Sequence, residues 1–415
     1  MSIDQATSGR AKHFDVVIVG AGAGGIATAA SLLKRDKTLN IALIDPADKH
    51  YYQPGWTMVG GGIFNAPSTE RSMASVIPRN TTWIKQPVDG FDPDNNTVHL
   101  GDGSKVHYER MVVAPGLKLN WSGIDGLTEN LGKNGVTSNY SYKVAPYTWQ
   151  LVQGLEKGKA LFTQPPMPIK CAGAPQKAMY LSADHWTRQN RINNIDVQFY
   201  TSTPGLFGVA AYVPALMKYV EKYNAGLNFQ HTLTKIDGDK KIATFKNADG
   251  DIVESDFDMI HVCPPQCAPE FIAQSPLADA AGWVDVHQDT LQHTRYENIW
   301  SLGDCMNAPN AKTAAAARAQ APVVAVNLLH HAGKQTHHSR YDGYGSCPLT
   351  VERGKIVLAE FGYGGKLQPS FPKWLLNGEE PTSLAWILKA QMLPWIYWNA
   401  MLKGREWMAE PVHLV

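Results

Sequence analysis

The sequence predicts an α/β protein with two Rossmann-like dinucleotide-binding domains in tandem and a C-terminal membrane-associating helical region. Three observations lead to this fold: a strand–glycine loop–helix–strand unit near the N-terminus, a second series of strands from about residue 146, and a Trp- and Pro-rich sequence after residue 371. The 415 residues exceed one ordinary core. We expect a first domain from residues 14–145 and 285–330, a second from 146–284, and a C-terminal region from 331–415.

The N-terminal unit contains the glycine pattern that binds the pyrophosphate of a dinucleotide. The apolar run Val16–Val19 leads into Gly20, Gly22 and Gly25, and a helix-forming stretch follows. In this pattern the first glycine allows a tight turn, the second lets the pyrophosphate approach the backbone, and the third lets helix and strand pack closely. The next strand, 41–44, ends on Asp45, whose carboxylate is expected to accept hydrogen bonds from a ribose.

Short apolar runs bounded by turn residues predict the other strands, and an Ala-rich run predicts the helix after the last strand of the first domain. The first domain is expected to contain strands at 82–85, 97–100, 110–114 and 298–302 and a helix at 312–329. The second is expected to contain strands at 159–162, 196–200, 226–232, 242–245 and 259–262. Residues 341–360 suggest a hairpin.

A motif late in the sequence indicates that the dinucleotide is FAD. Ile299–Asp304 resembles the late flavin motif of flavoproteins with two dinucleotide-binding domains, in which the Asp after Gly binds the ribityl chain. Val112–Gly116 resembles the central Ala-Thr-Gly motif of the same superfamily, with Pro in place of Thr. The resemblance implies a cofactor site that also includes these residues: Gln53, Gly116, Gly303, Asp304 and Lys312.

The second domain lacks a loop for the phosphates of NADH or NADPH. The first strand is followed by Gln164–Pro168, where prolines replace the expected glycines and remove backbone N–H donors. Cys171 stands where the phosphate loop would be. This argues against an NADH:quinone dehydrogenase and a pyridine-nucleotide disulfide reductase. The latter would also need a close cysteine pair after Asp45, and residues 50–62 contain no cysteine.

Two of the five cysteines have surroundings that suggest chemistry. Cys171 lies between Lys170 and Lys177, and a neighbouring cation lowers the pKa of a thiol and favours the nucleophilic thiolate. Cys347 lies in a Gly-rich turn far along the chain, so only the fold would bring the two together. For either cysteine taken alone, a small buried side chain is the commoner role.

The remaining cysteines are interpreted as structural. Cys305 follows the flavin motif directly and is expected to pack beside it. Cys263 and Cys267 form C-x-x-x-C without a second Cys/His pair, which is a poor zinc site, so no metal is expected.

The segments around Cys171 and Cys347 resemble those of sulfide:quinone oxidoreductases, in particular the mitochondrial-like branch. These segments are Pro168–Lys177 and Tyr341–Leu349, and His50–Thr57 with the glycines 60–62 is similar to that branch as well. The resemblance extends from about residue 14 to residue 405. It implies that Cys171 and Cys347 are the redox pair, which oxidises sulfide to a persulfide, with FAD as cofactor and a quinone as electron acceptor.

The resemblance also implies that the sulfur leaves with a small acceptor, namely sulfite, a thiol such as glutathione, or cyanide. Lys177 and Lys389 are candidates to attract such anions. Many bacterial relatives carry a further cysteine before Cys171, sometimes tied to the flavin; residues 1–170 contain none, so non-covalent FAD is expected. Two alternatives stay open: the flavin subunit of a flavocytochrome c sulfide dehydrogenase, and a flavoprotein that senses sulfide or persulfide without turnover.

The segment 383–402 is apolar and aromatic and is interrupted by Pro394, next to Trp395. It is too polar to span a bilayer, but two short helices with Trp and Tyr suit the headgroup zone. We expect a peripheral (monotopic) protein of the bacterial or mitochondrial inner membrane. Phe361 and Tyr363 are expected to flank the quinone ring, and Pro394 and Trp395 are further candidates for the quinone site. A homo-oligomer interface or a core cover would explain the same composition. The net charge of +1 predicts no nucleic-acid partner.

Overall fold

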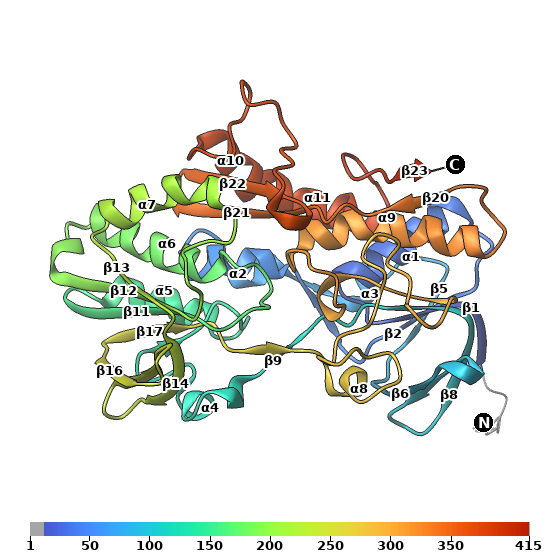
Figure 1. The fold of residues 1–415 in the computed structure, drawn as a ribbon, viewed down its shortest axis with the longest axis horizontal. Helices are drawn as coiled ribbons and strands as arrows, with labels where there is room; N and C mark the ends of the chain where they lie inside the picture. Colours follow the sequence, from blue (N-terminus) through green and yellow to red (C-terminus); the bar gives the residue numbers. More distant parts are fainter. Residues whose placement is uncertain (1–11, 415) are drawn as a thin grey trace, which may run out of the picture.

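Two α/β domains lie side by side in the computed structural model, and the C-terminal region lies across both (Figure 1). The structure describes residues 12–414. In Figure 1 the blue strands of the first domain are on the right and the green elements of the second are on the left. The orange and red C-terminal segments run along the top, from helix α9 (Ala314–His331) to the hairpin above the second domain.

The first domain has a parallel sheet in the order β5-β2-β1-β8-β19, which is a Rossmann-type arrangement. The bounds of these strands are Thr81–Ile84, Ile41–Ile44, Lys12–Val19, Lys105–Val113 and Ile299–Ser301. Two antiparallel strands, β7 (Thr97–Leu100) and β6 (Val88–Asp92), extend the sheet. Helix α1 (Ala23–Arg35) follows β1 as expected. The chain order reverses between β1 and β8, and open α/β sheets bind ligands at the carboxyl ends of the strands at such a point.

The second domain has a parallel sheet in the order β10-β17-β11-β12-β13. The bounds of these strands are Val136–Thr137, Met259–Val262, Gly158–Gln164, Ile195–Thr201 and Gly226–Phe229. A three-stranded antiparallel sheet packs on one face, formed by β14 (Thr232–Asp237), β15 (Ile242–Lys246) and β16 (Ile252–Asp256). Helices α5 (Ala145–Gly154), α6 (Ala174–Arg188) and α7 (Val213–Lys222) contribute to the other core. The single strand expected at 226–232 is two strands, because Gln230 has a φ of 57° and turns the chain between the sheets.

The chain crosses between the domains at the antiparallel pair β9 (Lys118–Leu119) and β18 (Gln266–Cys267), which corrects the expected boundaries. Strand β10 pairs with β17, so the second domain begins well before residue 146. Ile272 and Leu277 belong to the core of the first domain, so the chain has returned before residue 285. Strands of two residues are too short to give a periodic signal, and the sequence analysis therefore missed both crossings.

The C-terminal region contains the expected hairpin, β21 (Gly345–Glu352) and β22 (Lys355–Phe361). Successive side chains of a strand point to opposite faces. One face, with Cys347 and Leu349, joins the core of the second domain beside α6. The other face, with Ile356 and Leu358, packs under α10 (Ser383–Ile387) and the segment before it.

The end of the chain is one continuous helical run instead of the expected two helices separated at Pro394. Helix α10 continues through a π-helical turn (Leu388–Met392) into α11 (Leu393–Asn399). Pro394 lies in the first turn of α11, where a missing N–H is tolerated. Beyond α11, the buried Glu406 accepts hydrogen bonds from Arg35 at 2.6 and 3.0 Å, which fixes the tail to α1.

The remaining elements are short. They are β3 (Lys49–Tyr51), α2 (Trp56–Gly60), β4 (Glu70–Ser72), α3 (Met73–Val76), α4 (Leu127–Asn130), α8 (Glu270–Ala273), β20 (His338–Arg340) and β23 (Val412–Leu414). Within residues 12–414 no helix has both the length and the apolar character needed to cross a bilayer.

Candidate functional site

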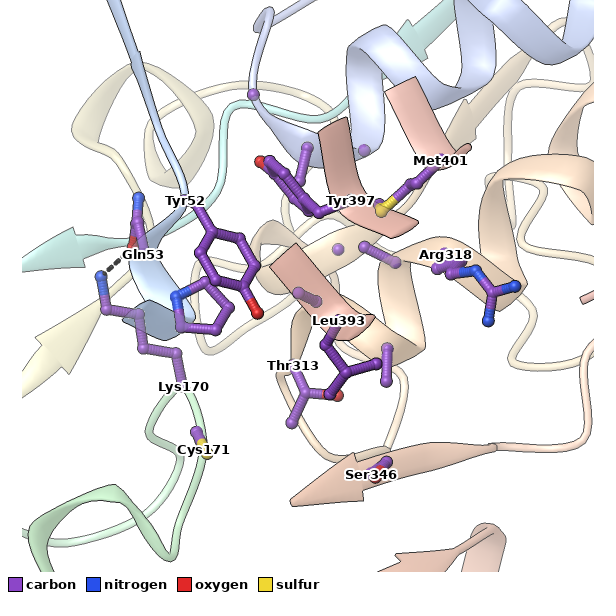
Figure 2. A pocket seen from close by; sticks show the side chains of 18 of the residues that line it. Tyr52, Gln53, Lys170, Cys171, Thr313, Arg318, Ser346, Leu393, Tyr397 and Met401 are labelled. Carbon is purple, nitrogen blue, oxygen red and sulfur yellow. Dashed lines mark hydrogen bonds between the residues drawn. The ribbon is translucent and has the colours of Figure 1, made fainter. Parts of the chain in front are cut away.

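A cavity of about 870 Å³ lies where the two domains and the C-terminal region meet (Figure 2). Its walls come from the glycine loop, the segment 49–57, the loop that carries Cys171, the start of α9, the hairpin, and the helical run of the tail. In Figure 2 Tyr52 and Leu393 lie near the centre, Cys171 approaches from the second domain, and Ser346 lies on its strand below. The predicted site residues therefore converge from distant parts of the sequence.

The glycine loop has the geometry that its motif predicts. Gly20 has a φ of 94°, and a Cβ atom there would lie 2.6 Å from the carbonyl oxygen of Ala114. A Cβ atom at Gly25 would lie 1.9 Å from the carbonyl oxygen of Gly20, so this contact between helix and strand requires glycine. Gly22 borders the cavity and has open space where its Cβ would be. The loop is thus shaped for close approach of a ligand to the backbone.

The other predicted cofactor residues surround the same space. Asp45 borders the cavity, and its carboxylate also accepts the N–H of Ala21 at 2.7 Å, which holds the glycine loop. Gly116 and Gly303 both have a φ of 78°, and a Cβ atom at either would have no neighbour within 4 Å. Lys312 borders the cavity, and its ammonium donates hydrogen bonds to the carbonyl oxygens of Asp304 and Met306, at 2.9 and 2.8 Å. Lys312 therefore orders the loop around Asp304.

Unpartnered polar groups test whether these residues fit a dinucleotide. The indole nitrogen of Trp56 and both amide atoms of Asn139 are buried in the cavity wall and have no hydrogen-bond partner among the described residues. Buried polar groups normally have partners, so these atoms indicate a polar ligand. Together with the glycine loop and Asp304, the wall fits an extended dinucleotide such as FAD.

The two candidate cysteines are in contact. Cys171 lies in the loop before α6 and Cys347 in β21, and their sulfur atoms are 3.1 Å apart. A disulfide bond is about 2.05 Å long, so the pair consists of two free thiols at a separation that a small shift would close. Cys171 borders the cavity and has a φ of 85°, whereas Cys347 lies behind it and is 2% exposed. Gly173 packs closely on β21, since a Cβ atom there would lie 2.1 Å from the end of the Leu349 side chain and 2.9 Å from the Cys347 sulfur.

The charge next to the cysteines comes from Lys177. Its ammonium lies 3.2 Å from the Cys171 sulfur and 3.8 Å from the Cys347 sulfur. A hydrogen bond from Cys347 and the charge of Lys177 hold the pKa of Cys171 well below its ordinary value. The same hydrogen bond, together with burial, raises the pKa of Cys347 well above its ordinary value. The ammonium of Lys177 lies closer to Cys171 than to Cys347 and therefore favours the thiolate on Cys171.

Lys170, the other cation beside Cys171 in the sequence, points elsewhere. Its ammonium donates to Gln53 at 2.6 Å (Figure 2). It also lies over the rings of Trp56 and Tyr140. Gln53 thus borders the cavity as predicted, but its carbonyl oxygen is taken by Lys170. Lys170 directly precedes Cys171 in the sequence but is not the cation that lowers the pKa of the Cys171 thiol.

Lys389 brings a second buried cation to the cavity. It lies in the π-helical turn, is 3% exposed, and donates to the carbonyl oxygen of Pro54 at 3.1 Å. Burial and the nearby charge of Lys177 lower the pKa of Lys389 to about 8. Neither Lys177 nor Lys389 pairs with a carboxylate in the described part of the chain. Two cations without a counter-ion make this part of the cavity attractive to anions.

The other three cysteines lie outside this contact. Cys305 is fully buried in the first domain, where Ser301 contacts its sulfur. Cys263 is buried near Tyr140, and burial raises its pKa to about 12. Cys267 lies in β18 at the domain crossing. Their positions agree with the structural roles proposed for them.

Three of the residues expected to contact the quinone do not line the cavity. Phe361 packs into the core of the second domain against Phe207, and Tyr363 packs on Tyr341 and bonds to the carbonyl oxygen of Gln288. Pro394 is also outside the lining, although its neighbour Trp395 is part of it. These are corrections to the quinone site expected from the sequence.

The opposite wall of the cavity carries a polar group that no sequence motif indicates. It consists of Tyr344, Ser346, Glu360 and Ser370, with Arg318 of α9 nearby. Ser346 and Glu360 are directly paired across the hairpin, each one residue away from a residue that faces the second domain. Successive side chains of a strand point to opposite faces, so the position of Ser346 next to Cys347 could have indicated that Ser346 lies on the opposite face of the hairpin.

The second domain carries Cys171 where relatives with nicotinamide sites have a phosphate loop. Between β11 and α6 the chain contains three prolines in residues 164–168, which offer no N–H donor. The loop continues into Cys171 at the cavity wall. This placement supports the expectation that the second domain presents a thiol in place of a nicotinamide.

Comparisons with known proteins agree with this geometry. Residues 14–152 match the family model described as pyridine nucleotide-disulphide oxidoreductase. The chain is 42% identical to the mitochondrial sulfide:quinone oxidoreductase of Dictyostelium discoideum, over 94% of this chain and 86% of that protein. It is 38% identical to the protein of the same name from Mus musculus, over 94% and 87%. The solved sulfide:quinone oxidoreductase of the hyperthermophilic bacterium Aquifex aeolicus has the same fold, with a TM-score of 0.78 at 21% identity, over 95% of this chain and 92% of that one.

Proposed function

This chain belongs to the sulfide:quinone oxidoreductase family, and from that premise we propose that it oxidises sulfide through Cys171, Cys347 and FAD and reduces a quinone. The observation that carries the proposal is the 3.1 Å approach of the two sulfur atoms at the wall of a cavity that fits a dinucleotide. Cysteines 176 positions apart come into contact here beside a buried lysine. Such a pair is suited to thiol–disulfide chemistry.

The proposed first step is attack of HS⁻ on a Cys171–Cys347 disulfide. A bond forms between the sulfide sulfur and Cys347, the disulfide bond breaks, and Cys171 leaves as a thiolate. The thiol with the lower pKa is the better leaving group, and that thiol is Cys171. The added sulfur then remains on Cys347 as a persulfide, and the thiolate stands at the cavity wall.

The second step transfers the outer sulfur to an acceptor, namely a second sulfide, sulfite, a thiol such as glutathione, or cyanide. Cys347 is left as a thiol, and re-formation of the disulfide from the two reduced cysteines releases two electrons. FAD held by the first domain would supply the two-electron acceptor for this step and the electron donor for the quinone. Lys177 and Lys389 support anionic partners in both steps, because the two buried ammonium groups border the cavity without carboxylate partners.

The cofactor is held by residues of the first domain. Gly20, Gly22 and Gly25 shape the pyrophosphate loop, and Asp304 stands where the ribityl chain is expected. No cysteine precedes Cys171 in the sequence, which supports non-covalent binding.

We further propose that the C-terminal region attaches the protein to one leaflet of a membrane. Large apolar side chains are exposed along this region: Trp374, Leu375, Leu384, Ile387, Met392, Trp395, Trp407 and Met408. Four of them, Met392, Trp395, Trp407 and Met408, also border the cavity. A lipid-soluble quinone would thus pass from the bilayer to the cavity along apolar side chains. The names of the Dictyostelium and mouse relatives support a mitochondrial location, and the Aquifex relative a bacterial one.

The test is anaerobic titration of the purified, FAD-loaded protein with sodium sulfide, followed by decylubiquinone. Sulfide should bleach the flavin absorbance, and the quinone should restore it through repeated cycles. A flavin that sulfide does not bleach would overturn the proposal. Recovery with a c-type cytochrome but not with quinone would indicate a flavocytochrome-type subunit, and a single bleaching without turnover would indicate a sensor.

A further inference from the structure

We propose that Glu360 is a catalytic residue of the quinone half-reaction, in which it gives a proton to a quinone carbonyl oxygen and regains one from solvent through Ser370. The inference rests on the proposed function and adds to it a residue that neither the sequence motifs nor the cysteine chemistry indicates.

Glu360 is a buried carboxyl group without a cation. It lies on β22, borders the cavity, and is 4% exposed. No lysine, arginine or histidine within residues 12–414 forms an ion pair with it. Buried carboxyl groups are rare unless they are paired, and an unpaired one in a cavity wall is a candidate for function.

The hairpin places Glu360 on the side of the cavity away from the cysteine pair. Cys347 faces Ala359 across the hairpin, and both belong to the core of the second domain. Ser346 faces Glu360, one residue further along each strand, and their side chains therefore point to the other face. That part of the wall also contains Leu358, Phe371 and Met392, an apolar surface continuous with the exposed side chains of the tail. The carboxyl group thus stands where a quinone arriving from lipid would lie.

Hydroxyl groups connect Glu360 to solvent. One carboxylate oxygen accepts from the Tyr344 hydroxyl at 2.7 Å and the Ser370 hydroxyl at 2.5 Å, and the other accepts the N–H of Ser370 at 3.0 Å. Ser370 is exposed, and the Tyr344 and Ser370 hydroxyls are themselves 3.1 Å apart. Hydroxyl groups can donate or accept, so the first oxygen can carry a proton while the second keeps the N–H. A proton can therefore pass from solvent to the carboxyl group of Glu360 through one hydroxyl group, that of Ser370.

The proton balance of quinone reduction requires such a group. A quinone becomes a quinol by taking up two electrons and two protons, and the electrons come from sulfide through the cofactor. In the proposed step the O–H bond of Glu360 breaks, an O–H bond forms on one quinone oxygen, and water reprotonates the carboxylate through the Ser370 hydroxyl. A bound, reduced cofactor would supply the electron pair and the second proton. Arg318 borders the same cavity, and its charge acts on Tyr344, whose hydroxyl donates to Glu360.

The experiment separates the two half-reactions of the FAD-loaded enzyme in an anaerobic stopped-flow instrument. Glu360→Gln keeps the size of the side chain and its hydrogen bonding but has no proton to transfer. Bleaching by sulfide should keep its parental rate, and reoxidation by decylubiquinone should slow at least about tenfold, since a general acid contributes about 10²- to 10⁴-fold. Reoxidation by ferricyanide, which takes electrons without protons, should be unchanged. Glu360→Asp should restore part of the quinone rate, and Glu352→Gln on the same hairpin serves as the matched control.

Ser370→Ala provides a second variant that leaves the carboxyl group in place. It should slow quinone reoxidation and spare ferricyanide reoxidation, because it interrupts only the path to solvent. The inference is overturned if quinone and ferricyanide rates fall together in the Gln variant, which would indicate a structural role, or if the quinone rate does not fall. If quinone fails to reoxidise the parent enzyme, the proposed function itself is overturned, and that outcome is distinct from either result on Glu360.

Discussion

Replacing Lys177 by Met should impair the sulfide half-reaction by removing the charge that favours the Cys171 thiolate. The ammonium lies 3.2 Å from the Cys171 sulfur, and Lys177 is 4% exposed, so water screens little of this interaction. Methionine is unbranched and of similar length, and helix α6 should therefore keep its packing. The substitution changes the charge and little else.

The size of the effect follows from the distance. At 3.2 Å and an effective dielectric constant of about 20, attraction between the ammonium and the thiolate amounts to about 5 kcal/mol. Part of this gain is offset in the native protein by the cost of burying the ammonium. If a third of this attraction, about 1.7 kcal/mol, remains as net stabilisation of the thiolate, its loss in the variant should slow bleaching by sulfide at neutral pH more than tenfold. The pKa of Cys171 rises in the variant, so the rate should recover as the pH is raised.

Alkylation of the reduced protein by iodoacetamide measures the thiolate directly. The rate of labelling of Cys171, followed by mass spectrometry across a pH series, should shift to higher pH in Lys177→Met. Lys170→Met is the matched control, because the Lys170 ammonium is engaged with Gln53 at 2.6 Å and should not affect the profile. If Lys177→Met labels Cys171 with the parental pH profile, or if both variants shift alike, the assignment of Lys177 is wrong.

The site and the C-terminal surface lead to three further expectations. NADH and NADPH should not bleach the flavin, because residues 164–168 offer no phosphate cradle, and rapid bleaching at micromolar concentration would contradict this. Cys171→Ser and Cys347→Ser should each abolish bleaching by sulfide while FAD stays bound, and Cys263→Ser should retain it; normal turnover of the Cys347 variant would disprove the paired mechanism. Substituting exposed apolar side chains of the C-terminal region should weaken binding to liposomes.

The parts of the fold that the sequence predicted are those with local signals. The glycine motif and the strands on either side of it depend on a few consecutive residues, and β1, α1 and β2 formed where expected. The domain crossings depend on β9 and β18, two residues each, whose pairing arises only in the tertiary structure. Local sequence therefore predicted the two α/β units but not the points at which the chain passes between them.

The candidate site likewise has residues that the sequence predicted and residues that only the tertiary structure brings together. The resemblance supplied the pairing of Cys171 and Cys347, and the sequence named two flanking cations without choosing between them. The structure selects Lys177, because α6 brings its ammonium back to the sulfur while Lys170 points to Gln53. The residue that the sequence favours for the quinone site, Phe361, lies one position from Glu360. A shift of one residue along a strand reverses the face, and Glu360 is the side chain that borders the cavity.

The membrane proposal is best tested at the surface of the C-terminal region. Truncation before α10 would remove Tyr397 and Met401, which belong to the core of the first domain, so loss of FAD would obscure the result. Trp374, Leu384 and Ile387 are 85%, 43% and 43% exposed and lie outside the cavity lining, so the triple Ser variant should keep FAD and bleaching by sulfide. Burying one such side chain contributes about 1.5–3 kcal/mol, so even partial insertion of three predicts at least tenfold weaker flotation with liposomes and slower reduction of long-tailed quinones. Ile252→Ser, at a position 63% exposed on β16, is the control. If the triple variant floats and reduces these quinones like the parent, the surface serves another contact and the attachment to membranes must be abandoned.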